Sequence, residues 1–125
     1  MTSSIKVYHG TSAAFEGFPS ARTTVYGLTG VYLTESIEDA WAFAGARFCG
    51  YDDEKPRVFE AMLSVEDGDV LDLSEVEFDD ESELHDAASE SGASVVIFPD
   101  MSGITEREIL VKRPSMLNWE RVITE

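Results

Sequence analysis

The stretch Gly27–Ser36, which reads GLTGVYLTES, carries the strongest local signal for the fold. Its apolar and β-branched residues predict a strand over Gly30–Thr34. A serine in the N-cap position and apolar residues at helical spacing then predict a helix over Ser36–Arg47. Tyr32 on the strand and Phe43 on the helix can converge where the two elements meet. Two facing rings would form a slot for a flat heterocycle, although both can equally be ordinary core residues.

Other apolar runs predict a strand-rich domain. Five runs rich in β-branched and aromatic residues predict strands: Ile5–His9, Val58–Ser64, Ser94–Phe98, Ile109–Lys112 and Trp119–Ile123. A second helix is predicted over Asp80–Ser91. Its apolar side would carry Leu84, Ala87 and Ala88. His85 is assigned to its acidic, exposed surface. Strands and helices do not alternate regularly, and neither GxGxxG nor GxxxxGK(S/T) occurs, so we expect an α+β domain and not a doubly wound nucleotide-binding fold.

The chain of 125 residues has the size of one domain, which we expect to span 1–125. Hydrophobic residues make up 43% of it, enough for an ordinary core, to which we assign Trp41, Phe59 and Trp119. The single cysteine, Cys49, cannot form an internal disulfide. No run approaches the roughly 20 apolar residues of a membrane span, and the first residues lack the apolar core of a signal peptide. We therefore expect a cytoplasmic protein that binds no membrane.

The charge of the chain is strongly negative and unevenly distributed. Nine basic and 25 acidic residues give a formal net charge of −16. Between Asp52 and Glu90 there are 16 acidic residues against two basic ones, Lys55 and Arg57, a local charge of −14. Such a field repels phosphate backbones, which disfavours nonspecific binding of nucleic acid. The acidic segment is either a solvated face that keeps the protein soluble or a surface that meets a basic partner.

The sequence His9-Gly10-Thr11 places a histidine at the end of a predicted strand. A glycine at a strand end lets a ligand approach the backbone closely, because it has no side chain. A histidine beside it can hold a hydroxyl or another polar group. The alternative is a histidine that packs against a turn and has no ligand.

The sequence Thr105–Val111 places two carboxylates before an apolar strand. Strand periodicity puts Glu106 and Glu108 on one face and Arg107 on the other. A carboxylate aimed at a bound sugar can stabilise a developing cation, as in glycosidic cleavage through an oxocarbenium-like transition state. An acidic strand start is also common on ordinary protein surfaces.

In this order, the three motifs resemble the ADP-ribosyltransferase superfamily, in the His-Tyr-Glu branch typified by diphtheria toxin and the poly(ADP-ribose) polymerases. The resemblance covers nearly the whole chain and is greatest to the small transferase domains of phage and bacterial polyvalent or toxin proteins. Phe43 falls eleven positions after Tyr32, where that family has a second ring. The resemblance implies a split β-sheet core of two packed, mainly antiparallel sheets with few short helices.

The same resemblance implies a role for each matching residue. His9 would bind a ribose hydroxyl of NAD, and the backbone of Gly10 would bind the nicotinamide carboxamide. The rings of Tyr32 and Phe43 would enclose the nicotinamide. Glu108 would bind the nicotinamide ribose and stabilise its positive charge as the glycosidic bond breaks. The catalytic residues would therefore be His9, Tyr32 and Glu108, with NAD as substrate and no metal.

Other positions are assigned with the same resemblance in mind. Thr11 completes the first NAD-binding motif. Arg22 is the cation within 13–26 that we assign to the diphosphate, although it can also be an ordinary loop residue. Glu106 would lie on the acceptor side or would simply contribute surface charge. Ala40 stands where the family often has a serine that helps to hold the carboxamide, so one anchor differs here.

Three functions remain open on the sequence. The first is a mono-ADP-ribosyltransferase that cleaves NAD and modifies a macromolecule, which we expect to be a protein with a basic surface. Such an enzyme would serve as a phage or bacterial effector or toxin, acting in the cytoplasm of a host cell. The second is an NAD glycohydrolase, in which water replaces the acceptor. The third is a noncatalytic acidic protein that inhibits a basic, nucleic-acid-binding partner.

Overall fold

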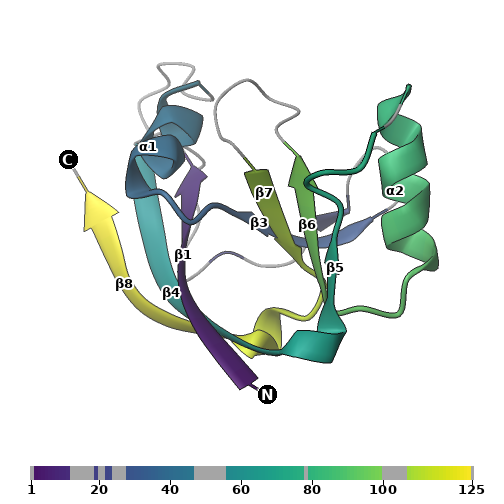
Figure 1. The fold of residues 1–125 in the computed structure, drawn as a ribbon. Coiled ribbons are helices and arrows are strands. Elements are labelled where there is room, and N and C mark those ends of the chain that lie inside the picture. Colours follow the sequence, from purple (N-terminus) through teal and green to yellow (C-terminus); the bar gives the residue numbers. More distant parts are fainter. Residues whose placement is uncertain are drawn as a thin grey trace.

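The computed structural model of the chain describes residues 2–11, 19, 22–23, 28–46, 56–77, 79–99 and 107–124. These segments contain eight strands and two α-helices, whose arrangement is drawn in Figure 1. In chain order they are β1 (Thr2–Thr11), β2 (Arg22–Thr23), β3 (Thr29–Leu33), α1 (Ile37–Ala46), β4 (Arg57–Glu66), β5 (Val70–Asp72), α2 (Glu81–Glu90), β6 (Val95–Pro99), β7 (Arg107–Val111) and β8 (Leu117–Thr124).

The strands form two sheets. The smaller sheet has the order β1-β4-β8 and is antiparallel throughout. The larger sheet has the order β2-β3-β7-β6-β5, in which only the β5–β6 pair is parallel. The two sheets meet at one antiparallel bridge between Tyr8, in β1, and Thr34, which directly follows β3. The expectation of an α+β fold with two mainly antiparallel sheets and few helices is confirmed at this level.

Two apolar clusters hold these layers together. The first draws residues from both sheets and therefore fills the space between them; it contains Val7, Val31, Leu33, Ala61, Leu63, Val65, Val95, Ile109, Val111 and Leu117. The second lies between the larger sheet and α2, and contains Leu28, Leu73, Leu84, Ala88, Val96, Phe98 and Leu110. Burying one such aliphatic or aromatic side chain contributes about 1.5–3 kcal/mol. The larger sheet is thus covered on both faces, by the smaller sheet and by α2.

The helix ends show why the helices form where they do. The hydroxyl of Ser36 accepts a hydrogen bond from the Asp39 N–H at 3.3 Å, which confirms the predicted cap of α1. The carboxylate of Asp80 accepts from the Ser82 N–H at 2.9 Å and begins α2 in the same way. Both predicted helices and all six predicted strands are present, with their ends shifted by a few residues. The short strands β2 and β5 were not predicted, because two or three residues carry no readable alternation.

One prediction about the second helix was wrong. His85 was assigned to the surface, but it is buried, with only 6% of its surface exposed. The reason is helical geometry: His85 follows Leu84 and precedes Ala88 by three positions, so it lies within the stripe that faces the sheet. Of the three aromatic residues assigned to the core, Phe59 is fully buried, whereas Trp41 and Trp119 are half-buried.

Within the described segments, neither helix combines the length and the apolar character that crossing a membrane requires.

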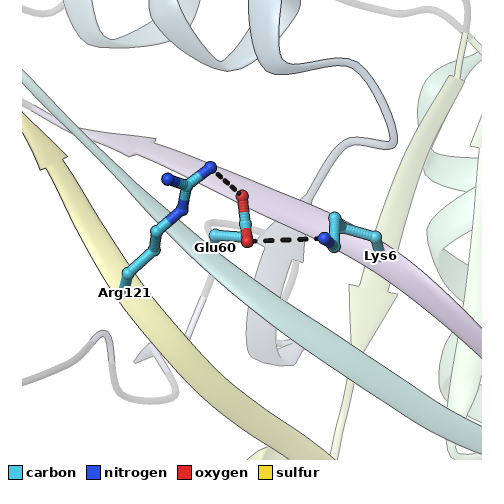
Figure 2. Close-up of polar contacts among 3 residues, drawn as sticks. All are labelled: Lys6, Glu60 and Arg121. Atoms are coloured by element: carbon cyan, nitrogen blue, oxygen red, sulfur yellow. Dashed lines mark hydrogen bonds and ion pairs between the residues drawn. The ribbon is translucent and has the colours of Figure 1, made fainter.

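A buried carboxylate lies on the central strand of the smaller sheet. The side chain of Glu60, in β4, is only 5% exposed. It forms ion pairs with Arg121 of β8 (Nη2 to Oε2, 3.0 Å) and with Lys6 of β1 (Nζ to Oε1, 3.6 Å), as Figure 2 shows. The hydrogen bond from Arg121 lowers the pKa of Glu60 below its ordinary value of 4.5, against the burial that would raise it. One carboxylate therefore links all three strands.

Replacement of this carboxylate tests its contribution. We expect Glu60→Gln to lower the free energy of unfolding at pH 7 by roughly 1 kcal/mol, the difference between a charge-assisted and a neutral hydrogen bond. Because the folded-state pKa of Glu60 is depressed, its contribution is present above pH 4.5 and is lost as the pH falls below that value. Urea unfolding at pH 7 and at pH 3.5 should show a smaller deficit of Glu60→Gln at the lower pH. An equal deficit at both pH values, or an equal effect of the exposed control Glu77→Gln, would contradict this account.

Candidate functional site

The predicted site is built at the junction of the two sheets. Tyr8 and Thr34 exchange two backbone hydrogen bonds of 2.8 and 2.9 Å, which bring β1 alongside the end of β3. Beside this bridge, the Nδ1 atom of His9 lies 2.7 Å from the backbone oxygen of Tyr32. The side chain of His9 therefore contacts the backbone of Tyr32, through a bond that joins the two sheets.

This bond also sets the state of the histidine ring. A carbonyl oxygen can only accept, so the Nδ1 atom of His9 carries the proton and donates it to Tyr32. In the neutral ring, Nε2 is then the acceptor nitrogen. A histidine in this tautomer is suited to receive a hydrogen bond from a hydroxyl group.

Close packing at Gly10 seats α1 against the strand that carries His9. A β-carbon on Gly10 would lie 1.8 Å from the backbone oxygen of Ala40, so no side chain fits at this position. Ala40 is itself fully buried. Phe43, the second predicted ring, lies three residues further along α1 and is half-buried. The helix that carries Phe43 is thus packed closely against β1 at Gly10.

Strand register brings Tyr32 and Glu108 to the same face of the larger sheet. Tyr32 in β3 is paired with Leu110 in β7. Because alternate residues of a strand share a face, Glu108 lies on the face of Leu110 and is the diagonal neighbour of Tyr32. Such neighbours have α-carbons about 7–8 Å apart, within reach of long side chains. Both residues are half-buried, so each keeps some access to a ligand.

The remaining predicted positions are described only in part. Thr11 is buried at the end of β1. The backbone of Arg22 lies in β2 and pairs with Gly30, but its side chain lies outside the described structure. Glu106 and Cys49 lie outside the described residues.

Two aromatic residues that the sequence did not single out adjoin this site. Phe98 in β6 is fully buried, and its ring centroid lies 6.4 Å from that of Tyr32. The ring centroid of His85, in α2, lies 5.1 Å from that of Phe98, and the two ring planes are inclined by 30°. The alternation of VVIFP over Val95–Pro99 does predict that Phe98 shares a face with Val96, but it does not say which strand lies beside them.

An open depression of about 590 Å³ lies at the N-terminal end of α2 and is lined by Val76, Glu77, Asp79 and Glu83. None of these residues belongs to the predicted NAD site. Among the residues that the structure describes, no group of three or more histidine, cysteine, aspartate or glutamate side chains is arranged to hold a metal ion.

Comparison with known proteins finds no family model, no curated protein and no solved structure that matches the chain.

The buried position of His85 predicts a pH-dependent stability. Burial lowers the pKa of His85 below its ordinary value of 6.5, although Glu81 and Asp86 on the same helix act to raise it. The native state therefore binds a proton less readily than the unfolded state, and stability falls as the pH drops below 6.5. His85→Phe keeps a ring against Phe98 and should remove this part of the pH dependence. Thermal unfolding of both proteins between pH 7.5 and 5.5 measures it; parallel curves would contradict the assignment.

Proposed function

We propose that the two sheets form an ADP-ribosyltransferase-like split core and that the chain is an NAD-dependent mono-ADP-ribosyltransferase. The observation that carries this proposal is the 2.7 Å contact between His9 Nδ1 and the Tyr32 oxygen at the junction of the sheets. It joins two of the three residues in the His-Tyr-Glu pattern, and the β3–β7 register adds Glu108 on the face of Tyr32. These two observations support the proposal for three residues that lie far apart in the chain.

The residues of the proposed site bind different parts of NAD. His9, with its proton on Nδ1, accepts a hydrogen bond at Nε2 from a ribose hydroxyl of NAD. The backbone N–H and C=O of Gly10 bind the nicotinamide carboxamide, as the resemblance implies. Tyr32 and Phe43 enclose the nicotinamide ring by stacking. Thr11 and Arg22 complete the NAD-binding set, the latter at the diphosphate.

Glu108 acts on the bond that breaks. As the bond between C1′ of the ribose and the nicotinamide nitrogen breaks, the electron pair leaves with neutral nicotinamide and positive charge develops on the ribose. The carboxylate of Glu108 stabilises this charge, an effect that is large where water is excluded. The acceptor then supplies an electron pair to C1′ and loses a proton, for which Glu106 is the candidate acceptor-side residue.

The charge of α2 supports a basic acceptor. The helix packs on the face of the larger sheet that carries Tyr32. Its exposed residues include Glu81, Glu83, Asp86 and Glu90. An acidic rim of this kind speeds encounter with a basic protein and loses its effect as salt is added. We therefore propose a basic protein as acceptor and, by the resemblance, a phage or bacterial effector as the biological setting.

The exposed acidic residues also favour a second candidate. A noncatalytic protein that inhibits a basic, nucleic-acid-binding partner would need only this surface and would make no use of Glu108. An NAD glycohydrolase would use the same NAD site with water as acceptor.

Labelled NAD separates these functions. We expect wild-type protein, incubated with cell extract and NAD⁺ labelled in its adenylate, to transfer label to acid-precipitable protein. His9→Ala, Tyr32→Ala and Glu108→Ala should each abolish transfer, and Glu108→Ala should retain NAD binding better than the other two. Glu108→Gln should reduce nicotinamide release about 100–1,000-fold, the range for removing one electrostatic stabiliser.

The control is Glu77→Gln, which removes one exposed carboxylate outside the site and should leave nicotinamide release unchanged. Release of free ADP-ribose without labelled protein would identify a glycohydrolase. A folded Glu108→Gln protein that keeps the full biological effect would contradict the enzyme and support the acidic inhibitor.

A further inference from the structure

Phe98 lies next to two residues of the proposed site, Tyr32 and Glu108. Its side chain is fully buried in the cluster between the larger sheet and α2. Its ring lies 6.4 Å from that of Tyr32, with the two planes inclined by 32°. Phe98 is also the direct cross-strand partner of Glu108. One buried side chain therefore adjoins both the residue proposed to stack on nicotinamide and the strand position that carries the carboxylate.

The ring of Phe98 also packs against a residue of α2. His85 of that helix lies 5.1 Å from Phe98, with an interplanar angle of 30°. His85, Phe98 and Tyr32 thus form a series of three rings that runs from the buried side of α2 to the half-buried site residue. Core side chains in such close packing have little freedom to change rotamer, so the last ring takes its orientation from the first two.

The two site residues depend on Phe98 in different ways. Tyr32 is contacted by the ring itself, so its orientation depends on the side chain at position 98. The backbone of Glu108 is held by the pairing of β6 with β7, which leucine at position 98 preserves. Loss of the ring should therefore disturb the Tyr32 side chain and leave the strand position of Glu108 unchanged.

We propose that Phe98 is a positioning residue that orients the Tyr32 ring for stacking on nicotinamide. This inference rests on the proposed function, since it assigns to Phe98 an effect on NAD binding. Tyr32 would stack on nicotinamide both in the bound substrate and in the transition state. Loss of this stacking therefore weakens the binding of both by a similar amount. Such a change raises KM and leaves kcat unchanged.

The test is the steady-state cleavage of NAD⁺ by Phe98→Leu, together with the dissociation constant of NAD⁺ from titration calorimetry. We expect KM and the dissociation constant to rise about 3–10-fold, the equivalent of one aromatic pair, with kcat within twofold of wild type. In addition, the ring resonances of Tyr32 in protein with labelled tyrosine, assigned with Tyr32→Phe, should shift and broaden. If Phe98→Leu does not fold, Phe98→Met, whose flexible side chain fills irregular gaps, is measured in its place.

The control is Leu63→Ala, a fully buried substitution in the cluster between the sheets. It should lower the thermal midpoint at least as much as Phe98→Leu and leave KM for NAD⁺ unchanged, because a merely destabilised protein keeps its site. An unchanged KM in Phe98→Leu, or an equal rise in Leu63→Ala, overturns this inference alone. Failure of the wild-type protein to bind NAD⁺ overturns the proposed function, and the role of Phe98 with it.

Discussion

The hydrogen bond from His9 to the backbone oxygen of Tyr32 is the interaction on which the site depends. It lies beside the Tyr8–Thr34 bridge, where the two sheets meet. The bond determines which nitrogen of His9 carries a proton, and it places the strand of Tyr32 against β1. The contact of Gly10 with Ala40 then seats α1 on the same strand, so the junction organises elements from both sheets and one helix.

The acidic residues that begin α2 lie at positions where negative charge does not destabilise the fold. Glu81 and Glu83 lie in the first turn of α2, where the helix dipole favours negative charge. The last turn has no basic residue of its own. Lys112, which directly follows β7, donates hydrogen bonds to the backbone oxygens of Ala88 and Ser91 at 2.7 and 2.9 Å. A strongly negative helix is thereby attached to the sheet through one lysine and an apolar face.

The sequence was sufficient for the local features and insufficient for the contacts between them. Alternation and capping predicted β3 and α1, and the Ser36 cap is present. Helical spacing also contained the signal for His85, which was assigned to the surface because its acidic neighbours were given more weight than its position beside Ala88. The proximity of Tyr32 to Glu108 depends on long-range pairing of β3 with β7, which no local pattern specifies. The tautomer of His9 likewise depends on a partner from another sheet.

A crystal structure of the Glu108→Gln protein with NAD⁺ would show where the dinucleotide binds, because this variant keeps the site and slows its chemistry. We expect the nicotinamide ring to stack on Tyr32, its carboxamide to contact the backbone of Gly10, and a ribose hydroxyl to lie within hydrogen-bond distance of His9 Nε2. NAD⁺ bound away from the junction of the sheets, or no bound NAD⁺ at millimolar concentration, would contradict this expectation.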